Sequence, residues 1–485
     1  MNKSKHFLFF LGMASLTFTG CSTSDNFADA AADDIPQLTE DEKWVLEANS
    51  DVEIKLGTGG NQAFSRAIIP DATDGNFETH EGIGMFCLAA SQFGDASAID
   101  WQQYKTVGTS ESDKKKRNEG RYMNWMGSGK STDGSINTTT WGGNVKANAT
   151  KVTENETTCT RIAWEDNFTR FYPMGNWYSY TFYGYHPYQE NVTTGPRTVT
   201  VDIPIDGYTD VLWGRSYKPE TAGESGDTWS QYAYSGRYFR QYYKENNKVD
   251  APVPTMKFKH ALSRLNFKIA RGDEKEEEKG TLYLKRLVLL GDVPTSVTMT
   301  VADLKYAPND KAEDENSTEG LITAVGTSYN TVKVPDIDED GGTATYNGVE
   351  LKCQETWNEE SNAYERTEFS SLPDGKGYLL EYKALAVSET PSEKYENYPS
   401  VGTGIIIPPT SDPDYQVLLT IGLDYKDGKS YEFTPQSPTK ISFTGNKIEA
   451  GKQYNIYITV YTPEEIVVNA ELVRWTEVDG SELEF

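Results

Sequence analysis

A short acidic motif carries the residue types that a calcium site would need. Residues 336–341 read D-I-D-E-D-G, the pattern that opens a calcium-binding loop, in which alternate carboxylates surround one ion. The twelfth position of such a loop is Asn347 instead of a bidentate glutamate, and no flanking helices are evident. We interpret residues 336–340 as an acidic surface turn and keep a calcium loop as the alternative.

Other candidate motifs lack the residues that complete their chemistry. The glycine-rich residues 57–65 are not followed by the Lys-Ser/Thr pair of a phosphate loop, and the H-E pair at 80–81 lacks the second histidine of a zinc protease. His260 lies among apolar residues with no second histidine or cysteine nearby, so we expect a packed core histidine with one satisfied nitrogen. No nucleophile–base pair stands out. The sequence therefore predicts no catalytic residue, metal or cofactor, and a protein that is not an enzyme.

The N-terminus has the composition of an export signal that ends at a cysteine. A short basic region precedes the apolar residues 7–18, a run too short for an ordinary transmembrane helix. Gly20 before Cys21 resembles the lipobox of bacterial lipoproteins, although Phe18 stands where leucine is usual. This predicts a signal peptide at residues 1–20 and a Cys21 thiol that carries acyl chains such as palmitate. The alternative is a plain secretory signal with a chance cysteine.

Composition indicates an all-β chain with an acidic surface. The 485 residues include 30 tyrosines, 10 tryptophans, 41 glycines and 21 prolines, which favour strands joined by many turns. There are 46 lysines and arginines against 73 aspartates and glutamates, a net charge of −27. Because this charge repels phosphate groups, nucleic acid and anionic lipid surfaces are not expected as partners.

The cysteines do not form a disulfide framework. Apart from Cys21 they are Cys87, Cys159 and Cys353, which show no C-x-x-C spacing. We expect small buried apolar side chains, and a single disulfide of unknown pairing remains open.

The strongest structural pattern is the alternation of apolar residues along 256–269. Met256, Phe258, His260 and Leu262 share one phase, whereas Leu265, Phe267 and Ile269 share the other. A one-residue slip would turn every later side chain to the wrong face of a sheet, so a bulge or bend is expected at residues 263–264.

Further apolar or alternating runs predict a chain of short strands. They lie at residues 51–56, 83–88, 177–188, 198–205, 282–290, 378–387, 405–407, 416–425, 453–460 and 465–475. Residues 101–166 read as polar and irregular, and 39–50 as one short helix. This pattern is typical of β-sandwiches. We predict an acylated tether and short helix at 21–50, an N-terminal sandwich at 51–292 and a C-terminal sandwich at 293–485.

Several motifs occur in an order that resembles one family. They are S-R-A at 65–67, E-G-I-G-M-F at 81–86, T-F-Y-G-Y-H-P-Y at 181–188, D-V-L-W-G at 210–214, F-K-H-A-L-S at 258–263, L-K-R-L-V-L-L-G-D-V-P at 284–294 and I-x-V-x-A-x-L-x-x-W at 466–475. Together with the lipobox, they resemble the fimbrillin-like proteins of Bacteroidetes, the subunits of type V pili.

The resemblance implies two transthyretin-like β-sandwich domains in tandem and export as an outer-membrane lipoprotein. It also implies assembly by strand exchange. A protease would cut between Arg66 and Ala67, and the first strand would leave a groove. The residues of that displaced strand are Val52, Ile54 and Leu56. A neighbouring subunit's last strand would fill the groove with Ile466, Val468, Ala470 and Leu472.

These expectations lead to one function and one alternative. The leading hypothesis is a structural or adhesive subunit of a cell-surface fimbria, with other fimbrial subunits as partners through β-strand complementation. Its long polar stretches at 101–166 and 220–248 would suit a tip or accessory subunit that contacts a host or bacterial surface ligand. The alternative is a surface-exposed, glycan-binding lipoprotein that does not polymerise. In that case the aromatic residues 177–188 would stack on sugars, whereas strand spacing favours packing in the core.

Overall fold

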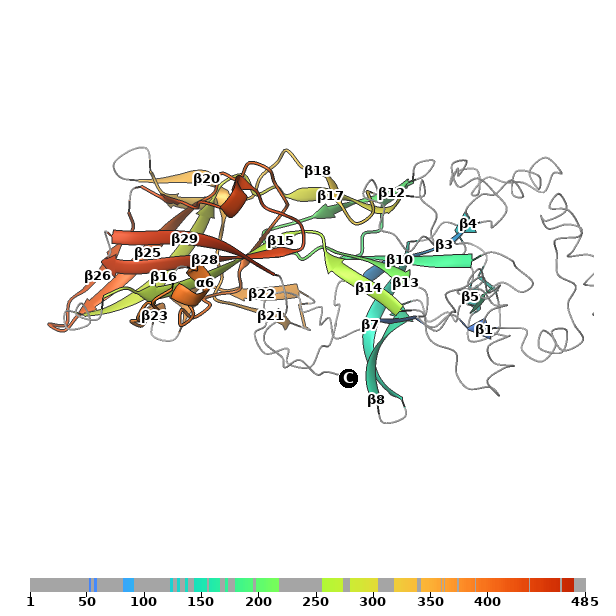
Figure 1. Ribbon diagram of the computed structural model, residues 1–485, viewed down its shortest axis with the longest axis horizontal. Helices are drawn as coiled ribbons and strands as arrows, with labels where there is room; N and C mark the ends of the chain where they lie inside the picture. The colour runs from blue at the N-terminus through green and yellow to red at the C-terminus, as the bar shows by residue number, and fades with distance from the viewer. Residues whose placement is uncertain are drawn as a thin grey trace, which may run out of the picture.

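The structure is a computed structural model with almost only β-strands in its described part (Figure 1). It describes residues 52–53, 56–58, 82–90, 123–124, 129–130, 136–137, 144–154, 157–165, 171–172, 179–194, 198–217, 255–273, 280–303, 318–337, 342–358, 360–361, 363–372, 375–388, 390–435, 437–462 and 465–474. The all-β fold class is confirmed. The predicted helix at 39–50 lies outside the described residues.

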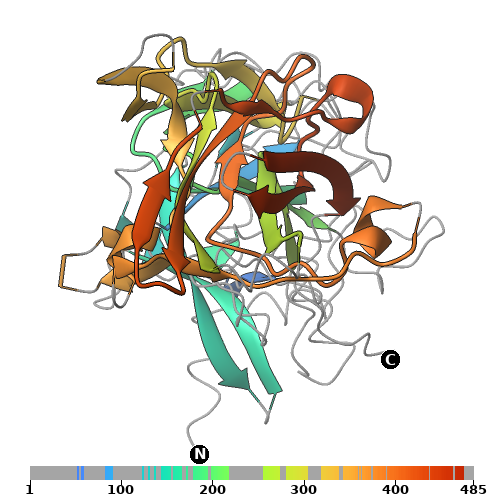
Figure 2. The same ribbon diagram turned by 90° about the vertical axis from the view of Figure 1, so that its left-hand side faces the viewer.

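Most strands of the N-terminal half form a sheet that closes on itself. Its spatial order is β10-β13-β14-β2-β8-β7-β3-β4, and β10 also pairs with β3, so every strand except β4 belongs to a ring. The β7–β8 hairpin projects from the ring (Figure 2). The strands are β2 (Leu56–Thr58), β3 (Ile83–Ala90), β4 (Met123–Asn124), β7 (Val145–Glu154), β8 (Thr157–Trp164), β10 (Ser179–His186), β13 (Leu212–Tyr217) and β14 (Thr255–His260).

A four-stranded antiparallel sheet lies beside the ring, in the order β11-β12-β17-β18. Its strands are β11 (Val192–Thr194), β12 (Thr198–Pro204), β17 (Ser296–Asp303) and β18 (Ile322–Val325). In β12 the buried side chains are Val199, Val201 and Ile203, and Asp202 between them is exposed. This alternation of burial confirms the strand expected at 198–205.

Two sheets build the C-terminal half. One has the order β24-β15-β28-β29, and the other β19-β20-β16-β25-β26, with β23 on β16 and β27 on β25. Buried residues of both sheets belong to one hydrophobic cluster, which also includes residues of β12 and β17. The first sheet has β15 (Ser263–Arg271), β24 (Ile405–Ile407), β28 (Lys452–Thr462) and β29 (Glu465–Arg474). The second has β16 (Gly280–Leu290), β19 (Thr331–Pro335), β20 (Thr343–Glu350), β23 (Tyr378–Leu380), β25 (Gln416–Tyr425), β26 (Ser430–Phe433) and β27 (Thr439–Lys440).

The remaining elements are short. Three two-stranded antiparallel sheets are described. They pair β1 (Val52–Glu53) with β9 (Phe171–Tyr172), β5 (Gly129–Lys130) with β6 (Ile136–Asn137), and β21 (Gln354–Asn358) with β22 (Ala363–Thr367). Helical turns are α6 (Pro391–Lys394), η5 (Phe369–Ser371) and η7 (Thr444–Asn446).

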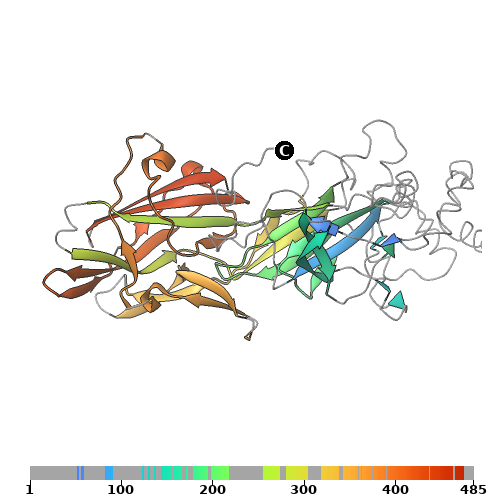
Figure 3. The same cartoon turned by 90° about the horizontal axis from the view of Figure 1, so that it is seen from below.

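One segment of chain passes directly from the ring into the C-terminal sheets (Figure 3). β14 ends at His260, residues 261–262 bend, and β15 continues in another sheet, parallel to β28. The expected change of phase is therefore present, two residues before the predicted position. β17 then returns to pair with β12, so strands from both sides of the predicted boundary at 292 share a sheet. The two-sandwich division at 292 stays a prediction.

The prediction of an irregular segment at 101–166 was wrong, because it contains β7 and β8. The inward residues of β7 are Val145, Ala147 and Ala149, all buried. Alanine contributes little to a hydrophobic pattern, and lysine and asparagine separate these positions, so the alternation is weak in sequence. The predicted strand at 378–387 is also shorter than expected, since β23 covers only its first three residues.

A buried ring in β14 depends on two glycines in the neighbouring strands. Phe258 is 2% exposed. A Cβ atom built on Gly214 of β13 would lie 2.7 Å from Phe258 Cδ1, and one built on Gly184 of β10 would lie 3.0 Å from Phe258 Cζ. The phenyl ring therefore lies directly over the backbone of both strands. Any residue larger than glycine at position 184 or 214 would take the space that the ring fills.

We predict that Gly214→Ala lowers the free energy of unfolding by about 1–3 kcal/mol, because the added methyl group overlaps the Phe258 ring. Urea unfolding of Gly214→Ala, Phe258→Leu and the double variant measures the effect. The smaller side chain makes room for the methyl group, so the double variant is more stable than the sum of the two losses implies. Strict additivity of the two changes would contradict this packing.

Candidate functional site

A three-residue strand completes the ring of the N-terminal half. β2 lies between β8 and β14: Leu56 pairs with Ile162 in antiparallel fashion, and Thr58 pairs with Met256 in parallel. The Leu56 side chain is 1% exposed, and Ile162 and Met256 are buried as well. The seam between β8 and β14 is therefore filled by a segment from near the start of the chain.

The other predicted N-terminal site residues are placed less fully. Val52 belongs to β1, where it pairs with Tyr172 of β9, outside the ring. Ile54, Arg66 and Ala67 lie outside the described residues, as does Cys21. Of the predicted displaced strand, Leu56 is thus the residue that the structure places in the seam.

The last described strand lies at the edge of a sheet. β29 pairs with β28, with Ile466 opposite Val460 and Leu472 opposite Tyr454. Ile466, Val468 and Ala470 are half-buried against the main hydrophobic cluster. Their alternate positions place them on one face, in line with Leu472.

Beyond β28, β29 has no strand partner in the described ranges. Val467 is 41% exposed and Leu472 is 40% exposed, so part of its apolar surface stays in contact with solvent. An edge strand with unpaired backbone groups and alternating apolar side chains can add to the sheet of another chain. β2 and β29 together provide a short strand in a seam and an apolar strand at an edge.

A contact between an imidazole and a buried carboxylate lies where the chain leaves the ring. Nδ1 of His260 is 2.8 Å from Oδ2 of Asp210, whose side chain is 1% exposed. The expected core histidine with a satisfied nitrogen is confirmed. Its partner Asp210, 50 positions earlier in D-V-L-W-G, was not predicted, although an aspartate in an apolar motif is itself a signal of a buried polar contact.

Arg264 follows this pair at the start of β15. Burial lowers the pKa of its guanidinium to about 10, and the Asp210 carboxylate opposes that shift. Nη2 donates a hydrogen bond to the Thr403 carbonyl at 3.2 Å. The crossing segment thus brings the His260 imidazole and the Arg264 guanidinium near one buried carboxylate, that of Asp210.

A second buried carboxylate, Glu319, fastens the β17–β18 hairpin to the ring. It accepts hydrogen bonds from the Tyr183 hydroxyl at 3.0 Å, the Asp303 backbone N–H at 3.1 Å and Arg215 Nη1 at 3.1 Å. Burial raises the pKa of Glu319, against the lowering effect of Arg215. The Trp213 indole adds a hydrogen bond to the Val301 carbonyl at 2.7 Å.

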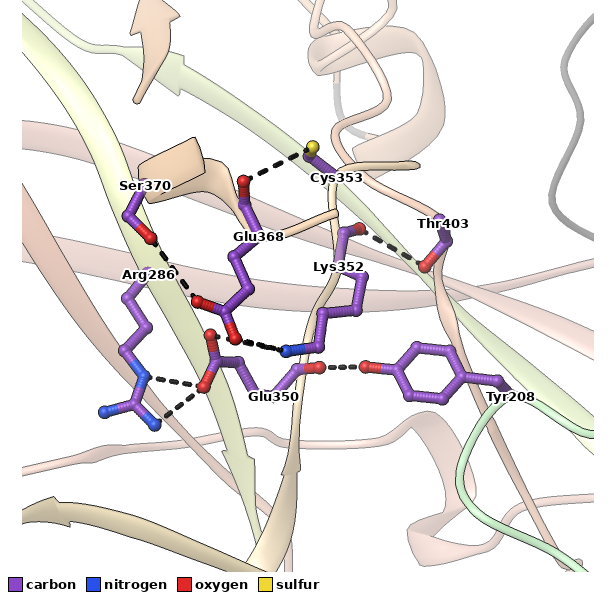
Figure 4. Close-up of polar contacts among 8 residues, drawn as sticks. All are labelled: Tyr208, Arg286, Glu350, Lys352, Cys353, Glu368, Ser370 and Thr403. Atoms are coloured by element: carbon purple, nitrogen blue, oxygen red, sulfur yellow. Dashed lines mark hydrogen bonds and ion pairs between the residues drawn. The ribbon is translucent and has the colours of Figure 1, made fainter. Parts of the chain in front are cut away.

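A polar network ties the turn after β12 to the strands β20–β22 (Figure 4). Arg286 Nη2 lies 2.7 Å from Glu350 Oε2, and Lys352 Nζ donates to Glu368 Oε1 at 3.0 Å. The Tyr208 hydroxyl donates to the Glu350 carbonyl. This arrangement pairs every charge with an opposite one, so it holds segments together and offers no vacant charge for a ligand.

Arg366 extends the network to the same turn. Its Nη1 lies 2.7 Å from Asp206 Oδ2, its Nε donates to Glu355 Oε1 at 2.9 Å, and its guanidinium carbon lies 4.4 Å from the centre of the Tyr208 ring. Burial would raise the pKa of Asp206, but Arg366 and hydrogen bonds from residues 208 and 209 lower it overall. Asp206 is therefore held as a carboxylate.

The described residues contain no group of three or more side chains arranged to hold a metal ion. Asp336 accepts a hydrogen bond from the Tyr346 hydroxyl at 2.9 Å, while 338–341 lie outside the description. None of the helices in the described ranges has the length and apolar character of a membrane span. Cys353 is a free, half-buried thiol, and the side chains of Cys87 and Cys159 are not described.

The aromatic strand β10 packs inward. Phe182, Tyr183 and Tyr185 are each at most 1% exposed, and the Tyr185 hydroxyl donates to Asn144 Oδ1 at 2.6 Å. These rings are part of the core, as strand spacing favoured, and cannot stack on a sugar at the surface.

Comparison with known proteins gives one family. The model of a family described as fimbrillin-like matches residues 127–393. The chain matches none of the curated proteins. Similar solved structures include a fimbrial protein from Bacteroides vulgatus (11% identical, TM-score 0.37, 87% of this chain and 99% of that one). Another is a fimbrilin from Porphyromonas gingivalis, which is 9% identical with a TM-score of 0.31 over 88% of this chain and 98% of that one. A third is a C-terminally truncated tip fimbrial protein from the same organism, which is 9% identical with a TM-score of 0.23 over 87% of this chain and 100% of that one.

We predict that Glu319→Gln changes how stability depends on pH. The pKa of Glu319 is raised above its ordinary 4.5 in the folded state, so the folded chain binds more protons between the two values. This group therefore adds to the free energy of unfolding as the pH falls, and its contribution is lost as the pH rises through the folded pKa.

Urea unfolding of the wild type and Glu319→Gln at pH 7 and at pH 5 measures this effect. The stability difference, wild type minus variant, is expected to grow at the lower pH. An equal difference at both pH values would show that the carboxyl titrates as in the unfolded chain.

Proposed function

Because the chain belongs to the fimbrillin-like family, we propose that it is a structural or adhesive subunit of a cell-surface fimbria. The family model covers more than half of the 485 residues, including β8, β10 and the crossing segment.

The proposed assembly mechanism is strand exchange after removal of the first strand. The observation that carries it is the position of β2 in the seam between β8 and β14, with Leu56 buried. A cut between Arg66 and Ala67 would separate β2 from the ring eight residues after Thr58. Release of β2 would expose two strand edges and the pocket of Leu56, which a strand from a neighbour could fill.

The proposed donor is β29. It carries Ile466, Val468, Ala470 and Leu472 in the alternation that a strand needs to fill pockets on one face. It also forms an edge of its own sheet and has one described strand neighbour, so its exchange disrupts a single ladder. Before processing, acyl chains on Cys21 would hold the subunit at the outer membrane and the cell surface.

We predict that Arg66→Gln prevents both processing and fibre formation. The substitution removes the basic side chain that an arginine- or lysine-directed protease requires, so β2 stays in the seam. Mass spectrometry of protein from the native cell surface gives the N-terminus, and electron microscopy gives the fibres. The wild type is expected to start at Ala67, and the variant at an acylated Cys21.

Arg117→Gln is the matched control, because Arg117 ends the charged run D-K-K-K-R at 113–117, about fifty residues after the proposed cut. It should leave processing and fibres unchanged. Normal fibres from Arg66→Gln would contradict the mechanism. A wild-type chain that keeps an acylated Cys21 and β2 would favour the alternative, a non-polymerised glycan-binding lipoprotein, which affinity gels with polysaccharides would then test.

We predict that a peptide of residues 465–474 binds the processed chain and not the uncut one. The same peptide with Val468→Asp should bind about tenfold more weakly or worse, because a carboxylate would enter an apolar pocket. Fluorescence anisotropy of the labelled peptides measures both affinities. Equal binding of the two peptides would exclude β29 as the donor.

A further inference from the structure

The two central strands of one C-terminal sheet run in the same direction and pair along most of their length. β15 and β28 form a parallel ladder of eight residue pairs, from Arg264 opposite Gln453 to Arg271 opposite Val460. Both strands lie along the long axis of the molecule (Figure 1). Because the strands are parallel, the start of β15 and the end of β28 lie at opposite ends of the ladder.

These two strand ends lead to the segments that the proposed strand exchange would place in contact with other subunits. β15 begins at Ser263 and follows directly on β14, which lines the seam that β2 occupies. β28 ends at Thr462, and residues 463–464 connect it to the proposed donor, β29. After exchange, β29 would lie in the next subunit, and a donor from the previous subunit would lie against β14. Tension along the fibre would then pull β15 at its start and β28 at its end.

Opposite pulls at the two ends of a parallel ladder load it in shear. Each strand is drawn along its own axis, so the hydrogen bonds of the ladder carry the force together and must break together. A pull on both strands at the same end would instead break the pairs one at a time. Shear therefore requires the larger force, and this depends on the barrier to separation in that direction, not on the free energy of unfolding.

The ladder is shielded on both faces from water that would compete for its hydrogen bonds. On the outer face, Asn266 Nδ2 donates a hydrogen bond to Oδ1 of its register partner Asn455 at 2.9 Å, and Tyr395 stacks on Tyr457 with ring centres 4.7 Å apart. The core face carries apolar side chains that are each 0% exposed, namely Leu265, Phe267, Ile269, Ile456, Ile458 and Val460.

The bend between the seam strand and the ladder is tied on both sides. The Ala261 N–H donates to the Val211 carbonyl just before β13, and the Leu262 carbonyl accepts from the Gly451 N–H just before β28. Each of these hydrogen bonds is 2.8 Å long. A force on β14 therefore reaches β15 through a bend whose backbone groups are already engaged.

We propose that the β15–β28 ladder is a mechanical clamp that carries tension through the subunit, a role that rests on the fimbrial function and strand exchange proposed above. The clamp keeps β28, and with it the donor strand, attached to the ring that holds the previous subunit. Its strength comes from the parallel direction of the two strands, because antiparallel strands pulled at the same two points would separate pair by pair.

Single-molecule force spectroscopy of the mature chain, residues 22–485, tests the clamp without fibres. Arg66→Gln blocks the proposed exchange, and an azide-bearing amino acid at two positions attaches the handles. Handles at Thr255 and Thr462 pull β15 from its start and β28 from its end, in shear. Handles at Asp273 and Thr462 are the matched control, because they pull at the end where both strands finish.

At the same loading rate, we expect the first pair of handles to need a force about twofold or more higher, since the ladder breaks as a unit. The length of chain released at each step shows which strands have separated. Urea unfolding of both labelled chains checks that their stabilities are equal, so that a difference in force reports the direction of the pull.

Equal forces in the two directions would overturn the proposal. So would a first rupture under shear that leaves β15 and β28 paired while another part of the chain between the handles unfolds. Either result leaves the proposed fimbrial function standing, because that function is tested by processing and fibre formation. A failure of the fimbrial function would instead appear as absent fibres, which is an observation independent of the force measurement.

Discussion

The buried contact between His260 and Asp210 lies at the point through which both halves of the structure are connected. Residues 255–271 form β14 and β15 in succession, one in the ring and one in a C-terminal sheet. At the bend, the Ala261 N–H donates to the Val211 carbonyl and the Gly451 N–H to the Leu262 carbonyl, each at 2.8 Å. Burial of a carboxylate is costly unless it is paired and hydrogen-bonded, so this contact fixes how the two sheets meet.

Further polar ties act at a distance from this crossing. Glu319 joins the β17–β18 hairpin to β10 and β13, and Arg366 joins the turn after β12 to the C-terminal strands. Each is a network in which charged groups have opposite charges or several hydrogen bonds as partners. Removing one member of such a network lowers the free energy of unfolding strongly, since the remaining charge is then buried without a partner. The networks favour one arrangement of the sheets over alternatives with equal apolar burial.

The strand edges of this frame are the places where the proposed pairing with other subunits would occur. A closed ring has no edge, and the ring here is closed by only three residues of β2. The C-terminal sheet instead ends in β29. A fimbrial subunit needs surfaces that join to other subunits. Backbone hydrogen bonds at such edges supply affinity without any cofactor.

Sequence by itself determined the class of fold and many of its strands, because side-chain alternation follows directly from burial of one face. The inward rows of β12, the bend between β14 and β15, and the common face of Ile466, Val468 and Ala470 all follow from local pattern. The satisfied core position of His260 follows from its apolar neighbours. The β7–β8 hairpin escaped this reasoning, since alanines at its inward positions give little hydrophobic signal.

Only the tertiary structure decided which strands pair and which polar residues meet. Nothing local indicates that Leu56 lies between β8 and β14, because those strands are about 100 and 200 residues away in the chain. The pairing of β3 with β10 that closes the ring, and the contact of Asp210 with His260, likewise join segments that are far apart in the chain. Pairing between distant strands is selected by the packing of the whole core. A single strand's pattern fixes which face is buried, but not the partner against which it is buried.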